Sequence, residues 1–180
     1  MRIEPVQRVL QSLDAPHALI GAHAMAARGY PRFTVDVDLL TADPRVLDPG
    51  VWIALQQTGA SVDARRGDAE DPLAGVVHIL LADSTDVDVV VARWKWEADV
   101  IERAAPMHVA DVQIKVPRTS DLILLKLAAG GYADLHDAAA LLALADESTI
   151  LEVERHIGDV RPDVGESWRE LLKGHPRTRA

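Results

Sequence analysis

The 180-residue sequence contains no cysteine. This absence excludes disulfides, thiolate metal sites and cysteine nucleophiles, and it is typical of a reducing compartment. Positive charge is also scarce, because 19 Lys and Arg residues against 28 Asp and Glu residues leave a net charge of -9. Such a balance argues against a broad face that binds nucleic acid through its phosphates, so we expect no broad DNA-binding surface.

Long apolar runs are missing as well. No run approaches the ~20 residues that a membrane-spanning helix needs. The N-terminal stretch MRIEPVQRVLQSLDA carries charges throughout, unlike an apolar signal segment. We therefore expect no membrane association and a cytoplasmic location. The sequence also lacks a Walker-type phosphate loop, Gly-x-Gly-x-x-Gly and Gly-x-Ser-x-Gly, and its seven histidines have no zinc-type spacing.

What the sequence does contain is the composition of a folded protein. Apolar residues make up 48% and charged residues 26%, which is typical of soluble globular chains. Strand and helix patterns alternate early, and helical patterns dominate late. This order predicts an α+β fold, with a mixed β-sheet covered by helices and a helical C-terminal region. We expect residues 1–116 to form the core and residues 117–180 to form a helical region packed on it as one unit.

Apolar periodicity and the positions of Gly and Pro place the individual elements. We expect helices at residues 6–13, 22–29, 44–59, 95–105, 120–131 and 133–145. The helix at residues 44–59 is expected to be broken or to begin near Pro49. We expect strands at residues 17–21, 32–40, 76–81 and 85–93, a short strand within 60–75 and two short strands within 107–116.

The stretch RFTVDVDLL, residues 32–40, has the pattern of a strand with an unusual face. Val35, Val37 and Leu39 alternate with Asp36 and Asp38, and residues two apart share one face of a strand. We therefore expect the three apolar residues to face the core and the two aspartates to face the other way. Strands disfavour Asp, and adjacent carboxylates stay ionised when water solvates them or a cation lies between them. Mg²⁺ suits such ligands, because it usually takes one or two carboxylates plus substrate phosphates.

The same pattern occurs a second time. In TDVDVVV, Asp86 and Asp88 share one face of the expected strand. If the two strands are neighbours, three carboxylates converge at one place, which is the arrangement that two-metal phosphoryl transfer requires. The spacing leaves another interpretation open, because Asp-x-Asp also occurs on the water-exposed face of an edge strand.

The stretch ALIGAHAMAARGYPRFTVDVDLL resembles the signature of the nucleotidyltransferase superfamily, in which a strand ends in Gly and a short helix leads to a strand with Asp-x-Asp. It is more closely similar to the minimal, abortive-infection toxin-type (AbiEii-like) nucleotidyltransferases. In these proteins R-x-T-x-D-hydrophobic-D follows the Gly-containing turn, and the matching residues here are Arg32, Thr34, Asp36 and Asp38.

Two later segments extend the resemblance over most of residues 18–144. VDVVVARW resembles the strand that supplies the third carboxylate, which is Asp88 here. SDLILLKLAAGGYADLHDAAALL resembles the downstream segment, an apolar helix with one lysine followed by a helix with Asp-x-x-Asp. Lys126, Asp134 and Asp137 match this segment.

The resemblance implies a nucleotidyltransferase-like fold and a Mg²⁺-dependent enzyme. The enzyme would transfer a nucleoside monophosphate from an NTP to an acceptor that is RNA (tRNA-like) or protein, as the toxin of a toxin–antitoxin pair with a cognate antitoxin as partner. Asp36, Asp38 and Asp88 would hold the metal, and Asp88 would help to deprotonate the attacking hydroxyl. Lys126 would neutralise phosphate charge, and the nucleotide would contact Gly21, Ala22, Arg32, Thr34, Asp134 and Asp137.

Physical reasoning alone leaves two roles for Lys126, the only charge between Leu122 and Ala129. Its ammonium either extends to the surface or contacts phosphates. Asp134 and Asp137 are three residues apart and share a helix face. They either orient Lys126 or the nucleotide, or they are solvated helix charges.

The turn and the late helices also depart from the pattern. Gly21 lets the backbone approach a triphosphate closely, but Ala22 stands where relatives usually have Gly or Ser, and the segment GGYADLHD is less basic than in relatives. These differences favour an alternative of another class, a non-catalytic protein of this fold that binds a nucleotide or a partner. The three retained carboxylates favour the enzyme, because a scaffold has no need of charges that repel each other.

Overall fold

The structure of the chain is a computed structural model that describes residues 2–174. Its backbone divides into two compact units, each of which is described by itself. Unit 1 consists of Met1–Ala27 and Pro31–Pro117, and unit 2 consists of Arg28–Tyr30 and Arg118–Ala180.

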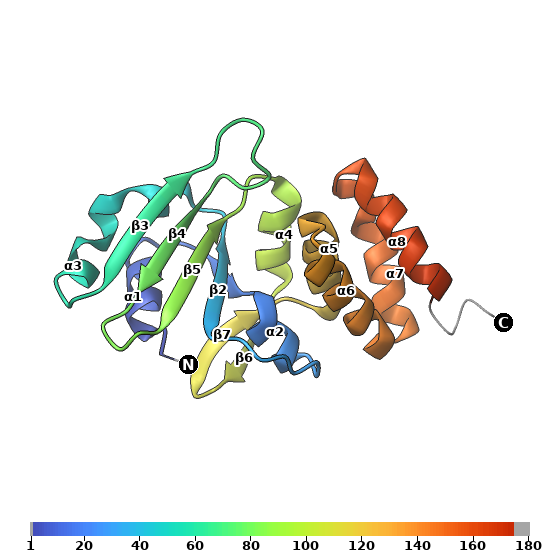
Figure 1. The fold of residues 1–180 in the computed structure, drawn as a ribbon, viewed down its shortest axis with the longest axis horizontal. Helices are drawn as coiled ribbons and strands as arrows, with labels where there is room; N and C mark the ends of the chain where they lie inside the picture. The colour runs from blue at the N-terminus through green and yellow to red at the C-terminus, as the bar shows by residue number, and fades with distance from the viewer. Residues whose placement is uncertain (1, 175–180) are drawn as a thin grey trace. The chain divides into compact units, whose positions relative to one another are not determined.

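Unit 1 contains a five-stranded mixed sheet (Figure 1). Its strands are β1 (His17–Leu19), β2 (Asp36–Thr41), β3 (Ser61–Arg66), β4 (Gly75–Leu80) and β5 (Asp86–Val91). They lie in the order β1-β2-β5-β4-β3, and β2 runs parallel to β5 whereas the other neighbours are antiparallel. A separate antiparallel hairpin consists of β6 (Ala105–Val109) and β7 (Val112–Val116). The predicted mixed sheet with helices is confirmed.

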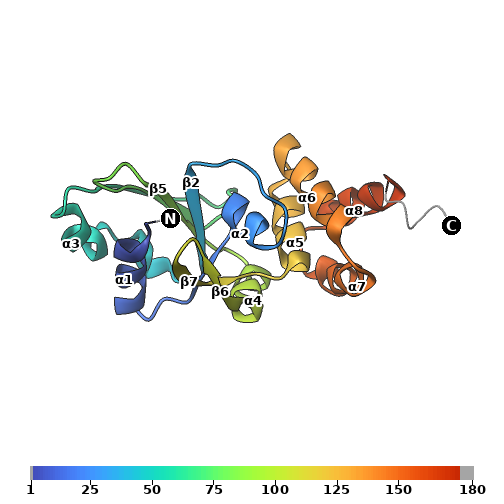
Figure 2. The ribbon, with the colours of Figure 1, turned by 90° about the horizontal axis from the view of Figure 1, so that it is seen from below.

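The helices of unit 1 precede or connect these strands in the sequence. They are α1 (Glu4–Ser12), α2 (Gly21–Ala27), α3 (Ile53–Gln56) and α4 (Lys95–Arg103), with 3-10 turns η1 (Pro44–Leu47) and η2 (Pro49–Trp52). Figure 2 shows α1 and α4 on the same side of the larger sheet. The helix predicted over residues 44–59 was expected to break or begin near Pro49, and the α-helix α3 begins only at Ile53, after two 3-10 turns. Asp43 and Asp48 each accept a backbone N–H two residues ahead, so two short capped turns replace its first half.

The larger sheet has one buried face and one open face. Val37, Leu39, Val87 and Val89 are at most 2% exposed, and their partners Val77 and Ile79 on β4 are fully buried. This alternation follows from the two-residue period of a strand. It confirms that the aspartates of β2 and β5 lie on the face opposite to the core.

The strand predicted at residues 32–40 begins later than expected. β2 starts at Asp36, whose partner on β5 is Asp86, and pairing with β1 begins only at Leu39. Residues 32–35 therefore have no strand beside them to satisfy their backbone groups as a ladder. The prediction that Val35 faces the core is wrong, because Val35 is 69% exposed.

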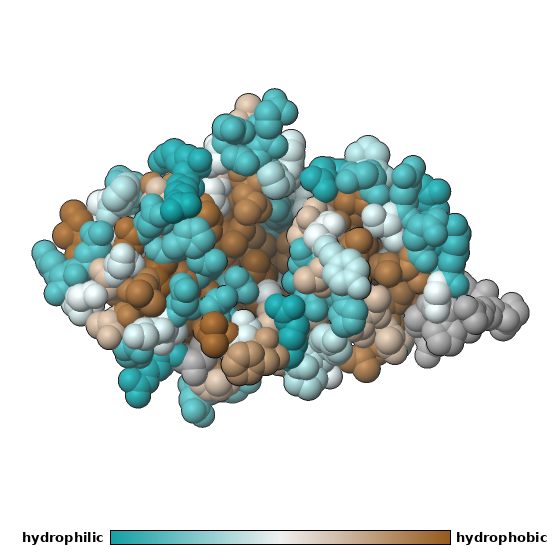
Figure 3. Space-filling view, viewed as in Figure 1, coloured by the Kyte–Doolittle hydropathy of each residue, from teal (hydrophilic) through white to brown (hydrophobic). Residues whose placement is uncertain are grey.

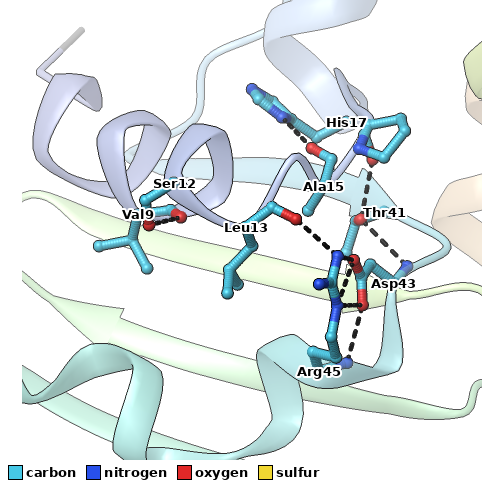
Figure 4. Close-up of polar contacts among 9 residues, drawn as sticks. Val9, Ser12, Leu13, Ala15, His17, Thr41, Asp43 and Arg45 are labelled. Atoms are coloured by element: carbon cyan, nitrogen blue, oxygen red, sulfur yellow. Dashed lines mark hydrogen bonds and ion pairs between the residues drawn. The ribbon is translucent and has the colours of Figure 1, made fainter.

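The far end of β2 is fixed to the connection between α1 and β1 (Figure 4). The buried Thr41 hydroxyl donates to the Pro16 carbonyl at 2.8 Å and accepts from the Asp43 backbone N–H. Arg45 donates to the Leu13 carbonyl at the end of α1 and pairs with the Asp43 carboxylate. The Arg45 hydrogen bond lowers the pKa of Asp43. These contacts hold β2 in place from the end opposite to its aspartates.

Unit 2 is helical. It contains α5 (Thr119–Ala129), α6 (Tyr132–Leu144), α7 (Glu147–His156), the 3-10 turn η3 (Ile157–Asp159) and α8 (Pro162–Gly174). Gly130 ends α5 with a φ of +70°, a conformation that favours glycine, and Gly131 is the N-cap of α6. Across residues 2–174, the helices are too short or too polar to cross a bilayer.

The start of α7 provides a test of stability against pH. The Asp146 carboxylate accepts hydrogen bonds from the Thr149 side chain and backbone N–H and from the Ser148 hydroxyl, which lower its pKa to about 2. A lowered pKa stabilises the fold at pH values above the ordinary value of about 3.9, and the benefit is lost as the pH falls towards about 2. We expect Asp146→Ala to be less stable than wild type in urea unfolding near neutral pH. The difference should shrink between about pH 4 and pH 2, and a difference that stays constant over that window would contradict this assignment.

Candidate functional site

Two aspartates lie side by side on the open face of the larger sheet. Asp38 on β2 is directly opposite Asp88 on the parallel strand β5, and neighbouring strands are about 4.8 Å apart. One step towards the start of both strands, Asp36 is opposite Asp86. The sequence predicted this convergence on the condition that the two strands are neighbours, and the structure fulfils that condition.

The exposure of these carboxylates differs along the strands. Asp36 and Asp86 are exposed at the strand starts, whereas Asp38 and Asp88 are half-buried. Leu80 is opposite Asp86 and is 49% exposed, and apolar surface lies over the sheet with hydrophilic residues around it (Figure 3). The site is therefore open enough for a ligand to reach, with Asp38 and Asp88 in its more enclosed part.

Gly21 makes room for the carboxylate of Asp38. Gly21 begins α2 with a φ of +63°, and a Cβ added there would lie 2.8 Å from the Asp38 Cγ and closer still to Oδ2. The Ile20 N–H donates to the Asp38 carbonyl at 2.8 Å, which joins the turn to β2. The glycine of the turn and the second aspartate of the motif thus form one packed unit, and neither position accepts a larger residue without movement of the other.

The remaining predicted residues of unit 1 surround the start of β2. The Thr34 hydroxyl accepts from the Asp36 backbone N–H at 3.3 Å, so Thr34 supports the first aspartate. Arg32 is exposed, and Ala22 is buried in α2 at 3% exposure. Phe33 lies between Arg32 and Thr34 and is 90% exposed. The contacts of Arg32, Thr34 and Ala22 with a nucleotide stay predictions.

His78 is a residue of this site that the sequence analysis missed. It is on β4 directly opposite Asp88, and its Nδ1 lies 2.6 Å from Asp88 Oδ1. Asp38, Asp88 and His78 therefore form one row across three neighbouring strands. The signal was a polar residue in the middle of VVHILL, but only the pairing of β4 with β5 connects it to Asp88.

The two carboxylates of this row, Asp38 and Asp88, are suitable ligands for a magnesium ion that also binds a substrate. Among residues 2–174, no three His, Asp or Glu side chains form a complete metal site by themselves. Mg²⁺ does not require such a cage, since it usually binds one or two carboxylates together with substrate phosphates and water. Asp38 and Asp88, adjacent and partly accessible, supply oxygen donors of that kind.

Lys126, Asp134 and Asp137 form a separate cluster in unit 2. Lys126 on α5 places its Nζ 2.8 Å from Asp134 Oδ1 and 2.9 Å from Asp137 Oδ2, both on α6. The side chains are 17%, 28% and 2% exposed, respectively. Gly131 makes the approach possible, because a Cβ there would lie 2.8 Å from Asp134 Oδ2. Both aspartates of the Asp-x-x-Asp segment therefore hold this lysine.

Two opposing effects act on the charge of Lys126. Burial lowers the pKa of Lys126, but hydrogen bonds and the negative charges of Asp134 and Asp137 outweigh burial, so its pKa is raised. The ammonium is therefore charged at neutral pH and is neutralised by two carboxylates within the unit. A role of Lys126 towards phosphate stays a prediction.

Comparison with known proteins supports the fold. No protein-family model and no curated protein sequence match the chain. Among solved structures, the antibiotic-resistance factor ANT(2'')-Ia has a TM-score of 0.55 and 16% identity, over 87% of this chain and 89% of that chain. The same factor in complex with adenylyl-2''-tobramycin has a TM-score of 0.55 and 15% identity, over 87% and 95% of the two chains.

A third solved structure is an antigenic nucleotidyltransferase-like protein from Paracoccidioides brasiliensis. It has a TM-score of 0.50 and 16% identity, over 93% of this chain and 90% of that chain. At these identities the likeness establishes the fold alone. The chain has the nucleotidyltransferase fold, as the sequence predicted.

Proposed function

We propose that the chain is a nucleotidyltransferase that moves a nucleoside monophosphate from an NTP to a hydroxyl group of an acceptor. The observation that carries this proposal is the adjacent pair of Asp38 and Asp88 on the open face of a nucleotidyltransferase-fold sheet, with Asp38 packed against the Gly21 turn. Asp38 and Asp88 lie side by side and half-buried, so their like charges repel each other, and a cation between them would relieve that repulsion. The same fold supplies phosphate-transferring sites in other proteins.

In the proposed reaction each of the three aspartates has a chemical role. Asp36, Asp38 and Asp88 would hold Mg²⁺, which would neutralise the triphosphate when bound. Asp88 would accept the proton of the acceptor hydroxyl as its oxygen attacks the α-phosphorus. A bond forms between that oxygen and the α-phosphorus, the bond from the α-phosphorus to the bridging oxygen breaks, and pyrophosphate leaves.

The acceptor and the biological role rest on the sequence resemblance. We propose RNA or protein as the acceptor, and a toxin whose cognate antitoxin is its partner. The bound adenylyl-2''-tobramycin of ANT(2'')-Ia makes a small aminoglycoside a useful comparison substrate. Label from an α-labelled NTP that enters RNA or protein supports the proposed acceptor. Label that enters only tobramycin would overturn the acceptor and leave the transfer reaction standing.

The first test is ligand-dependent thermal unfolding, because it requires no acceptor. With Mg²⁺ and the correct NTP at a hundred times its dissociation constant, stabilisation of about 2.7 kcal/mol is expected. For a chain of this size the melting temperature should rise by about 5–10 °C. Asp38→Asn removes one charge at nearly constant size, so it should lose the metal-dependent part of this shift.

The absence of any shift in melting temperature would contradict the proposed function. If no NTP raises the melting temperature of the wild type in the presence of Mg²⁺, the enzyme proposal fails, and the non-catalytic alternative explains the fold better. Asp63→Asn is a matched control, since Asp63 lies on the same face of the sheet on β3, opposite His78, with β4 and β5 between it and the strand of Asp38. This variant should keep the full shift.

A further inference from the structure

We infer that His78 is a positioning residue, which holds the Asp88 carboxylate in the orientation that metal and acceptor binding require. The inference rests on the proposed function, and it concerns a residue that neither the sequence motifs nor the fold comparison indicated. Three observations support it: the contact between His78 and Asp88, the row across the sheet, and the hydrogen bonds that Asp88 makes.

The contact between His78 and Asp88 identifies the donor and the acceptor of the hydrogen bond. His78 Nδ1 lies 2.6 Å from Asp88 Oδ1, and an ionised carboxylate only accepts hydrogen bonds. Nδ1 must therefore carry the proton and donate it. The Asp88 side chain is 29% exposed and that of His78 is 44% exposed, so the pair lies at the border of the enclosed part of the site.

The row across the sheet defines the direction of the contact. Asp88 on β5 has His78 of β4 on one side and Asp38 of β2 on the other. The imidazole therefore approaches Asp88 from the side away from Asp38. This placement keeps the imidazole off the side of Asp88 that faces Asp38, where the proposed cation would lie.

The hydrogen bonds of Asp88 show why it needs a positioning residue. Within residues 2–174, the only side-chain hydrogen bond of Asp88 is the one that Oδ1 accepts from His78, which leaves Oδ2 for a ligand. The terminal torsion of an Asp side chain is broad, so without His78 the carboxylate rotates freely. Hydrogen bonds to a metal-binding side chain are typically worth about 10- to 100-fold in metal affinity or activity.

The chemistry of His78 allows a specific set of substitutions. In His78→Asn the amide nitrogen stands at the same number of bonds from the backbone as Nδ1, so it can donate to Asp88. In His78→Gln the nitrogen is one bond further away. His78→Phe keeps a ring of similar size and has no donor. A role as donor therefore predicts rescue by Asn, and loss with Phe and Gln.

The experiment measures binding of Mn²⁺ together with each NTP by isothermal titration calorimetry, with wild-type protein and the three variants. Mn²⁺ takes the same carboxylate and phosphate oxygen ligands as Mg²⁺. We expect the dissociation constant to rise by about 10- to 100-fold in His78→Phe and His78→Gln and to return close to wild type in His78→Asn. His108→Asn is the matched control, because His108 is an exposed strand histidine on β6, opposite Gln113. It should bind as wild type does.

Each outcome decides between the proposals. If wild type and His78→Phe bind equally tightly, His78 does not position Asp88, and the proposed function is unaffected. If His78→Asn binds as weakly as His78→Phe while circular dichroism shows both folded, the donor role is overturned. If the wild type binds no Mn²⁺–NTP pair, the proposed function fails and the inference fails with it. Should His78→Phe not fold, the comparison of His78→Gln with His78→Asn still tests whether the position of the donor matters.

Discussion

Lys126→Met should lower the free energy of unfolding of this protein by about 3–5 kcal/mol, because it leaves a buried carboxylate without its partner. The Asp137 side chain is 2% exposed, and its Oδ2 lies 2.9 Å from Lys126 Nζ. Removal of one member of a buried ion pair exposes the full desolvation cost of the other. Urea unfolding monitored by circular dichroism measures the change.

Two further variants separate the parts of this effect. Lys126→Met combined with Asp137→Leu removes the two charges of the buried pair and leaves only Asp134, which is 28% exposed and reaches water, so the double variant should regain most of the lost stability. Lys173→Met is the surface control, since Lys173 and Glu170 are 70% and 71% exposed, and such pairs are typically worth about 0–1 kcal/mol. If Lys126→Met costs no more than this control, the cluster in unit 2 is not the stabilising ion pair described above.

The sign of the pH effect follows from the raised pKa of Lys126. A raised lysine pKa stabilises the fold at every pH below the ordinary value of about 10.4, and the benefit is lost only as the pH rises through the higher folded value. The destabilisation should therefore be undiminished across the neutral range. A loss of NTP binding in Lys126→Met is attributable to phosphate contact only if the Lys126→Met and Asp137→Leu double variant, once stable, shows it too.

Gly21→Ala should reduce any nucleotidyl transfer by about 100-fold or more, because misplacement of a catalytic group by about 1 Å has that effect. The added methyl group would overlap the Asp38 carboxylate, whose Cγ lies 2.8 Å from the Cβ position. The φ of +63° adds strain of about 1–2 kcal/mol for a residue with a side chain. The shift of the melting temperature with Mg²⁺ and NTP should disappear together with the activity.

Gly59→Ala is a control for backbone strain in the same unit. Gly59 has a φ of +93°, and a Cβ there would lie 3.6 Å from Ala82, an ordinary contact. Both variants should therefore lose stability, but only Gly21→Ala should lose the response to Mg²⁺ and NTP. Retention of the full response in Gly21→Ala would show that Asp38 need not occupy its present position for binding.

Local patterns were sufficient for most of the elements and for both aspartate pairs. Two-residue alternation in TDVDVVV and in the second half of RFTVDVDLL reflects a sheet with one buried face, a property that side-chain hydrophobicity sets directly. The pattern failed at Val35, because a strand also needs a neighbour for its backbone, and no strand pairs with residues 32–35. It was incomplete at residues 44–59, where capped turns compete with a longer helix.

Local sequence patterns did not predict which distant segments pair with each other. His78 is ten residues before Asp88 in the sequence, and its role depends on the register of β4 against β5. A register shift by one residue would place His78 on the buried face. Likewise, the sequence left open whether Asp134 and Asp137 orient Lys126, orient the nucleotide or are solvated helix charges. The turn at Gly130 and Gly131 and the packing of the two helices bring them within 2.9 Å.

Hydrophobic periodicity, a local property, was enough to predict that Asp36, Asp38 and Asp88 lie away from the core. The nucleotidyltransferase fold was implied by the resemblance of the motifs, in their order, to that superfamily. Three contacts became visible only in the folded chain: Asp38 is adjacent to Asp88, His78 Nδ1 lies 2.6 Å from Asp88 Oδ1, and Gly21 is packed against Asp38. These contacts depend on strand order and register, which are set by the packing of the whole sheet and not by any one segment.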